Sequence, residues 1–251
     1  MLYNYHTHTK RCHHACGEDR EYVENAVRGG VKILGFSDHA PYLFPDTDYY
    51  SNFRMGVDEL ESYAESIRAL AKEYANDIRI LCGFELEYFP DFHKEEMAFL
   101  QKIQPDYLIL GQHFLGNELP PIPARQRENI ALTAYVTQVL AGLATGDFLY
   151  LAHPDLAGYD FSEEVVRREY RRLCEGAKRM GVPLEFNMLG FRTKRHYPNR
   201  KFYEIAAEVG NDVVIGADAH DPQHVRCPAE EAEALALLRS LGVHVVDTPL
   251  L

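Results

Sequence analysis

Several features that would assign this protein to a familiar class are missing from its sequence. No hydrophobic run approaches the roughly 18 residues that a membrane-spanning helix needs. The five cysteines are odd in number and scattered, which argues against a disulfide framework and suits a reducing compartment. The chain reaches His6 too early for a secretory signal peptide, which needs an apolar core of about 7–15 residues. These absences predict a cytoplasmic protein that does not enter a membrane.

Positive charge is also scarce. The chain has 26 Lys and Arg against 38 Asp and Glu, which gives a formal net charge of −12. Affinity for nucleic acids comes largely from clustered Lys and Arg, so we expect no nucleic-acid partner. With 251 residues, of which 46% are hydrophobic, the chain can bury a sizeable core. We found no repeat, low-complexity tract or linker, and we expect one domain over residues 1–251.

Short apolar runs alternate with segments of helical periodicity along the whole chain. Strands are predicted near residues 2–6, 32–37, 78–86, 107–112, 148–152, 183–187 and 212–217, with a possible last one at 243–246. Helices are predicted at 18–28, 57–74, 94–102, 128–144, 162–180, 201–209 and 228–241. Glycines that follow three of these helices are predicted caps: Gly29-Gly30, Gly181 and Gly210. Seven or eight β-α units in series indicate an α/β fold with a parallel sheet, either open or closed into a barrel.

Polar side chains follow the predicted strands. His6, His8 and His14 follow the first predicted strand, Asp38-His39 the second, and Glu85 with Glu87 the third. His113 follows the fourth and His153-Pro154-Asp155 the fifth. The sixth ends in Glu185-Phe186-Asn187, and the seventh runs into Asp218-Ala219-His220. In parallel α/β folds the carboxyl ends of the strands gather at one face, where active sites are built. Seven consecutive strands are therefore expected to deliver imidazole, carboxylate or amide groups to one small area.

These residues also have an ordinary structural interpretation. A lone buried His is usually satisfied by one hydrogen bond, and an Asp at a strand end, such as Asp38, Asp155 or Asp221, is often a helix cap or a supporting group. As a set, however, seven histidines and two carboxylates offer too few matching donors and acceptors to satisfy one another away from water. Metal binding accounts for them better. A zinc knuckle built on Cys12 and Cys16 lacks a second Cys/His pair with finger spacing.

With these residues laid out, the chain resembles the PHP (polymerase and histidinol phosphatase) superfamily, most of all its stand-alone histidinol-phosphate phosphatases. The resemblance covers nearly the whole chain. It rests on His6-Thr7-His8, Cys12-His13-His14-Ala15 with Gly17, Ser37-Asp38-His39, Glu85, His113, His153 and Asp218-Ala219-His220. It implies a distorted (β/α)7 barrel of the PHP type with three divalent metal ions at its C-terminal face, and Zn, Mn and Fe all suit the ligands.

Carried over by motif, the resemblance divides nine ligands among the three ions. His6, His8 and Asp218 hold the first ion with a bridging Glu85, and His113 and His153 hold the second with the same Glu85; the third ion takes His14, His39 and His220. Glu85, Asp218 and His220 are the expected catalytic residues. His13 is the alternative to His14, and Glu87, which shares its strand face with Glu85, is a further possible contact for metal or substrate. His196 and His224 follow the sixth and seventh strands and are candidates for lining the pocket.

The implied activity is that of a metal-dependent phosphatase. A cluster of divalent ions suits hydrolysis of a phosphate monoester by a metal-bound hydroxide, because the ions also neutralise the phosphoryl oxygens. The implied reaction converts L-histidinol phosphate to L-histidinol and phosphate in histidine biosynthesis, so the expected partner is a small phosphorylated metabolite. Substrate contacts are expected from Asn187 and Arg192 after the sixth strand. Met188-Leu189, where the family has small polar residues, and Gln112, where it often has an aliphatic residue, leave another phosphate ester as an alternative.

Two other classes of protein share parts of this pattern. A non-catalytic PHP module, like that attached to some bacterial DNA polymerases, would carry similar histidines, but no polymerase segment or basic surface accompanies them here. An amidohydrolase-type barrel also begins with His-x-His, but usually relies on two metals and often on a bridging lysine. No lysine ends any predicted strand.

Overall fold

The computed structural model describes residues 1–44, 49–119, 129–157 and 162–251. Its strands are β1 (Tyr3–Asn4), β2 (Ile33–His39), β3 (Arg79–Leu86), β4 (Tyr107–Leu110), β5 (Leu184–Asn187), β6 (Asp212–Gly216) and β7 (His244–Val245). All the strand pairs are parallel. The predicted strand at 148–152 is reduced to bridges made by one residue, Leu151, which pairs with Leu110 on one side and Leu184 on the other.

The helices lie close to their predicted positions. They are α1 (Asp19–Arg28), α2 (Leu60–Glu73), α3 (His93–Leu100), α4 (Asn129–Leu143), α5 (Glu163–Met180), α6 (Met188–Arg192), α7 (Arg200–Val209) and α8 (Pro228–Ser240), with short 3-10 turns at Lys10–Cys12, Val57–Glu59, Gln101–Ile103 and Pro222–His224. Only α6 was not expected. Gly181 and Gly210 take the left-handed conformation that ends α5 and α7, whereas after α1 Gly30, rather than Gly29, does so. Among these residues, no helix is long and apolar enough to span a membrane.

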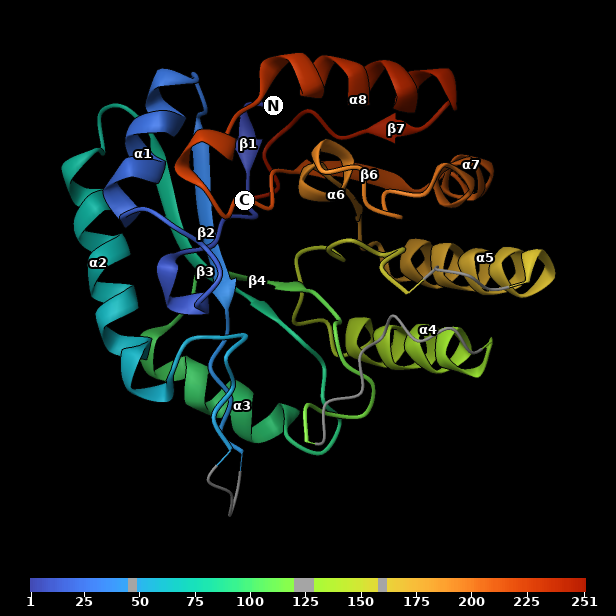
Figure 1. Ribbon diagram of the computed structural model, residues 1–251, viewed down its shortest axis with the longest axis horizontal. Helices are drawn as coiled ribbons and strands as arrows, with labels where there is room; N and C mark the ends of the chain where they lie inside the picture. The colour runs from blue at the N-terminus through green and yellow to red at the C-terminus, as the bar shows by residue number, and fades with distance from the viewer. Residues whose placement is uncertain (45–48, 120–128, 158–161) are drawn as a thin grey trace.

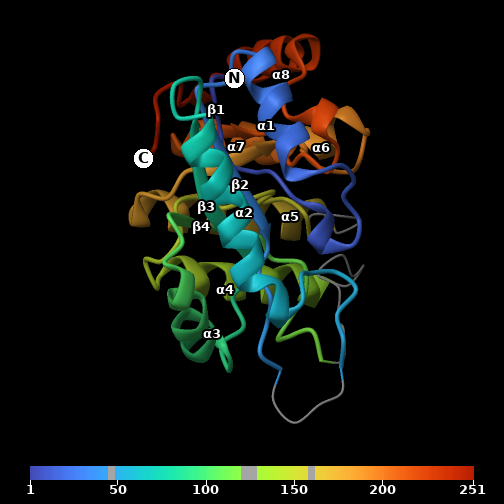
Figure 2. The same ribbon diagram turned by 90° about the vertical axis from the view of Figure 1, so that its left-hand side faces the viewer.

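The strands form a distorted barrel, as predicted. One sheet has the order β1-β2-β3-β4 and a second has the order β5-β6-β7. Leu151 joins the sheets between β4 and β5, and a bridge from Thr7 to Ala219 closes the ring beyond β1 and β6. Figure 1 shows α1 and α2 on one side of β1–β4, with α4, α5 and α8 on the opposite side of the molecule. In Figure 2, α2 runs along the outside of β2 and β3.

Alternation along the strands separates the barrel interior from its outer shell. On β2 and β3, Leu34, Phe36, Cys82 and Phe84 belong to the core cluster that includes buried helix residues, whereas Ile33 and Leu81 belong to a smaller cluster with Tyr107. The remaining buried members of that smaller cluster are Tyr5, Ile109, Tyr150, Ala152 and Val214. Four residues beyond Ile33 and Leu81 on the same face of β2 and β3 lie the polar Ser37 and Glu85, so an apolar plug lies beneath the functional end.

Glycines on the inner face make room for large side chains at that change. A β-carbon at Gly35 or Gly83 would lie within 2.5 Å of Tyr107, whose hydroxyl donates to the carbonyl oxygens of Tyr5 and Phe36. A β-carbon at Gly111 would lie 1.8 Å from Glu85 Oε1, and one at Gly216 would lie 1.7 Å from an oxygen of Glu185. The barrel therefore holds its two innermost glutamates against bare backbone.

Candidate metal centre

The carboxyl ends of the barrel strands bring the predicted ligands into one cavity of about 510 Å³. Eight of the nine line it: His8, His14, His39, Glu85, His113, His153, Asp218 and His220. The ninth, His6, is fully buried behind this surface, and its Nε2 lies 3.1 Å from His8 Nε2. The short first strand ends before both histidines, so their position depends on the Thr7–Ala219 bridge between them.

His6, His8, Glu85 and Asp218 form the deepest cluster, which we call the floor group. His6 Nε2 lies 3.4 Å from Glu85 Oε2 and 3.6 Å from Asp218 Oδ1. His8 Nε2 lies 3.4 Å and 3.3 Å from the same two oxygens. Tetrahedral ligands at about 2.0–2.2 Å from a zinc ion are roughly 3.3–3.6 Å apart, so these four atoms have the spacing of one metal site.

Two of these floor atoms lack a hydrogen bond, although each also lies near a further histidine: His39 Nδ1 is 3.1 Å from Glu85 Oε2, and His220 Nδ1 is 3.2 Å from Asp218 Oδ1. Glu85 Oε2 and Asp218 Oδ1 are buried and accept no hydrogen bond from the described residues. An ionised oxygen removed from water without a partner is costly, and a divalent cation would satisfy both at once. The donor set of imidazole nitrogens and carboxylate oxygens suits a borderline-soft transition metal. The residues therefore fit the implied ion.

The second oxygen of Glu85 faces a different pair of histidines. His153 Nε2 lies 2.7 Å from Glu85 Oε1, and His113 Nε2 lies 3.8 Å from it. We call His113 and His153 the side pair. Glu85 thus presents Oε1 to the side pair and Oε2 to the floor group and to His39, whose Nδ1 lies 3.1 Å away, and a carboxylate that faces two groups of histidines can bridge.

We call His14, His39 and His220 the rim group; His14 is exposed and His220 is partly exposed, whereas His39 is buried. Their ring centres are 4.8–6.4 Å apart. Two sets of possible ligand atoms lie within 4.8 Å of one another. One set comprises nitrogens of His8, His39 and His220, and the other comprises nitrogens of His14 and His220 with the Cys12 sulfur. His14 Nδ1 bonds the Cys12 carbonyl oxygen, and the buried His220 Nε2 has no described partner. The rim histidines are brought together, although His8 and Cys12 share their space.

Charge separates the floor from the rim. Burial disfavours the charged form of His6, but Glu185, Asp218 and Glu85 outweigh it and raise its pKa to about 10. Burial and the neighbouring His220 and His8 lower the pKa of His14 to about 4. Burial is also the main cause of the lowered pKa values of His39 and His220. Before any metal binds, the floor is an ion-paired cluster and the rim is a set of neutral imidazoles.

Glu185 and Asn187 at the end of β5 orient the floor group. Glu185 Oε1 lies 2.7 Å from His6 Nδ1, and Glu185 Oε2 accepts from the backbone N–H of His153. Asn187 Nδ2 donates to Glu185 Oε2 and to Asp218 Oδ2, both at 2.9 Å, while its Oδ1 caps α6 through Gly190 N. Asn187 was expected to contact substrate; in the structure its amide group donates to Glu185 and Asp218. Glu185 was among the polar residues at the predicted strand ends, but the sequence analysis gave it no role; its alternation with Asn187 along one strand was the available signal.

Glu87 holds His113 of the side pair in place. Its Oε1 accepts from His113 N at 3.0 Å and lies 3.2 Å from His113 Nδ1. Its Oε2 pairs with the buried guanidinium of Arg54, which also lies 2.6 Å from Glu118 Oε2. Carboxylates in this position fix the ring orientation of a metal-binding His. Glu85 Oε2 accepts no hydrogen bond from the described residues, whereas both oxygens of Glu87 accept one, from His113 and from Arg54.

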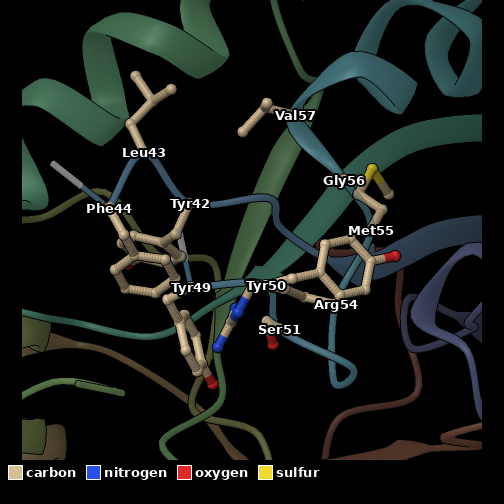
Figure 3. Close-up of a pocket in the computed structure, with 10 residues that line it drawn as sticks. All are labelled: Tyr42, Leu43, Phe44, Tyr49, Tyr50, Ser51, Arg54, Met55, Gly56 and Val57. Carbon is tan, nitrogen blue, oxygen red and sulfur yellow. The ribbon is translucent and has the colours of Figure 1, made fainter. Parts of the chain in front are cut away.

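Arg54 also anchors the loop that covers the rim group. Phe53, next to it in the chain, packs with a centroid distance of 4.3 Å on His39 and 5.3 Å on His14. On its other side Arg54 lies in a pocket of about 210 Å³ with Tyr42, Tyr49 and Tyr50, as Figure 3 shows. Tyr50 bonds His13 Nε2, so His13 lies outside the metal cavity.

The two arginines after β5 face different cavities. Arg192, the expected phosphate contact, lines a small cavity beside α8 with His224 and Cys227, and its guanidinium has no described partner. Arg192 is not among the residues that line the cavity of the predicted metal ligands. Arg195, three residues on, lines the metal cavity, and its Nη1 donates to the Tyr197 hydroxyl at 2.8 Å. His196 is also outside that cavity and bonds the Leu156 carbonyl oxygen.

Known proteins are similar to this chain in sequence and in fold. The family model described as PHP domain matches residues 4–189. A probable histidinol-phosphatase of Deinococcus radiodurans is 29% identical over 252 residues, covering 96% of this chain and 94% of that protein. A histidinol-phosphatase of Bacillus subtilis is 35% identical over 118 residues, 45% of this chain and 44% of its own length. The crystal structure of a Lactococcus lactis histidinol phosphate phosphatase complexed with zinc, L-histidinol and phosphate has a TM-score of 0.74 at 19% identity, covering 98% of this chain and 95% of that one.

Proposed function

Because this chain belongs to the PHP domain family and is a metal-dependent phosphatase, we propose that its substrate is L-histidinol phosphate. The products are L-histidinol and inorganic phosphate, and the reaction belongs to histidine biosynthesis. The family match and the relatives named histidinol-phosphatase support this substrate. So does the likeness in fold to a protein crystallised with zinc, L-histidinol and phosphate. The cytoplasmic location expected from the sequence stays a prediction.

The observation that carries the proposal is the pair of buried oxygens, Glu85 Oε2 and Asp218 Oδ1, which accept no hydrogen bond from the described residues and lie among histidine nitrogens at metal-site spacing. We propose three divalent ions. The floor group holds the first, the side pair with Glu85 holds the second, and the rim group holds the third. Eight of the nine proposed ligands line a cavity that is large enough for a small phosphorylated metabolite.

Bound ions would neutralise phosphoryl oxygens and lower the pKa of a coordinated water towards ~7. The chain's own residues supply the rest. Glu185 and Asn187 hold His6 and Asp218 in place, and Glu87 fixes the ring of His113. Arg195 brings a permanent positive charge to the cavity, which suits phosphate oxygens that face away from the ions. We therefore propose Arg195, in place of Arg192, as the cationic substrate contact.

Assays of the purified, metal-loaded protein against a panel of phosphate monoesters test the proposal. We expect L-histidinol phosphate to give the highest kcat/KM, and removal of metal by a chelator to abolish turnover until Zn or Mn is restored. The variant Glu85→Gln, assayed in parallel, shows whether turnover comes from this site rather than from a contaminating phosphatase. Preference for another ester would reject the substrate, and absence of turnover for every ester would reject the phosphatase activity as proposed for this chain.

A further inference from the structure

The lining of the metal cavity contains two polar side chains that are not proposed metal ligands. Four other lining residues, Phe53, Phe114, Leu156 and Leu189, are apolar. Among the residues that the structure describes, Arg195 and Tyr197 are therefore the protein's remaining polar contacts for a molecule bound there. The guanidinium of Arg195 is the permanent cation of the two, so the phenol of Tyr197 needs a separate explanation.

Tyr197 is firmly held with its ring beside the side pair. The residue is 3% exposed, and its ring packs edge-on to His153 at a centroid distance of 6.0 Å. Gly190 in α6 makes room for it, because a β-carbon there would lie 2.6 Å from the Tyr197 ring. The loop that follows α6 thus turns back over the cavity with its tyrosine fixed next to a metal ligand.

The hydrogen bonds of the phenol leave its proton uncommitted. Arg195 Nη1 donates to the phenol oxygen at 2.8 Å, and the guanidinium carbon also lies 5.9 Å from the ring centre. In the described ranges the hydroxyl hydrogen has no acceptor. A hydroxyl that accepts from a cation becomes a stronger donor, because the bond polarises it. Engaging a substrate atom would therefore cost Tyr197 no existing hydrogen bond.

We propose that Tyr197 is a catalytic residue that donates a hydrogen bond to the ester oxygen of the substrate as that oxygen becomes the leaving group. This role rests on the phosphatase function proposed above. As the bond between phosphorus and the ester oxygen breaks, negative charge grows on that oxygen. A fixed donor aimed at developing charge stabilises the transition state more than the ground state. Tyr197 and Arg195 then face the substrate from the loop that follows α6, with the Tyr197 ring beside His153.

The role is tested by comparing leaving groups in wild type and Tyr197→Phe. An alkyl ester such as L-histidinol phosphate leaves as a poorly stabilised alkoxide, whereas para-nitrophenyl phosphate leaves as a stable phenolate that needs little help. We expect Tyr197→Phe to lower kcat for the alkyl ester roughly 10²–10³-fold, as for loss of one oxyanion donor. For the aryl ester we expect a change within about threefold. Metal content should be unchanged.

A matched control removes a comparable hydroxyl outside the cavity. Tyr22 is buried in α1 and its hydroxyl donates to the Cys16 carbonyl oxygen, so Tyr22→Phe should leave the ratio of the two rates unaltered. Equal losses on both esters in Tyr197→Phe would overturn the donor role and assign Tyr197 a structural part. No loss on either ester would also overturn it. If wild type hydrolyses neither ester, the proposed phosphatase function fails, and the role of Tyr197 falls with it.

Discussion

In the floor group two imidazoles share their space with two carboxylates. The rim group brings three imidazoles close to one another, and two of them touch the same carboxylates, His39 at Glu85 and His220 at Asp218. The pKa of His6 is raised to about 10 and that of His14 is lowered to about 4, although both are histidines of the same cluster. The floor is electrostatically satisfied without metal only while its histidines keep their protons. The rim is ready to accept a cation as it stands. The same residue type is thus prepared for metal in two different ways.

The two groups also differ in what supports them. Floor residues are held by groups on β5 and by the closing bridge of the barrel, since Glu185 and Asn187 contact His6 and Asp218 directly. Of the rim residues, His39 ends β2 and pairs with Glu85 of β3, and Phe53 from a loop packs on His14 and His39. We therefore expect damage to the floor to be more severe than damage to its surroundings.

The largest effect is expected from Glu85→Gln. A neutral amide cannot bridge two cations a few ångströms apart, so kcat should fall by roughly 10³ or more, with loss of bound metal. Steady-state kinetics together with elemental analysis measure both quantities, and wild type should approach ~3 ions per chain. A content of one ion or fewer per chain in fully loaded wild type would contradict the proposal that Glu85 bridges two ions, one at the floor group and one at the side pair.

Arg195→Ala is expected to have the next largest effect. Removing the cation of the cavity should lower kcat/KM for a phosphate monoester by about 10²-fold without loss of metal. Arg192→Ala is the matched control, because Arg192 lines a different cavity, and we expect less than about threefold change. A larger loss in Arg192→Ala than in Arg195→Ala would restore the contact that the sequence alone suggested.

Glu87→Gln should have a smaller effect than either. Gln keeps a hydrogen-bond acceptor for His113 but removes the charge that pairs with the buried Arg54. We expect a roughly 10–100-fold weaker affinity for the most weakly held ion, as for other groups that orient metal ligands. Competition with a chromophoric chelator measures this affinity. Complete loss of metal would show that Glu87, and not Glu85, is the bridging carboxylate.

The smallest effect concerns pH and the metal-free protein. The raised pKa of His6 stabilises the fold fully below its ordinary value of 6.5, and this contribution is lost as pH rises through about 10. The lowered pKa of His14 acts oppositely, since stability falls as pH drops from 6.5 towards 4. Tm of chelator-treated protein should therefore decline on both sides of neutrality. A Tm that rises steadily from pH 7 to pH 10 would contradict the charged floor.

Much of the fold and most of the cluster could be predicted because both follow from local patterns. The helices were predicted from periodicity, and the gathering of polar side chains in one cavity was predicted because parallel strands end at one face. The sheets that contain β4 and β5 meet through residues 149–152, where Leu151 bridges to both sides but no regular strand forms, and a run of apolar residues cannot reveal this. The nine-ligand assignment and the single domain stay predictions.

The remaining parts depend on contacts between distant segments. Arg54 meets Glu87 and Glu118 across separations of 33 and 64 residues, in loops with no periodic signal. Arg192 and Arg195 could not be told apart because the short helix α6 was not expected. That helix ends at Arg192, which lies beside α8. The chain then turns back, so that Arg195 lines the cavity of the predicted metal ligands.

The bare backbone behind Glu85 and Glu185 has a consequence for how this protein tolerates change. Gly111 and Gly216 carry no chemistry and contact no ion, yet a single methyl group at either would occupy the space of a carboxylate oxygen. A library that replaces every residue in turn should find these two positions as unforgiving as the histidines. Random mutation can therefore destroy the enzyme by filling space as readily as by removing a ligand.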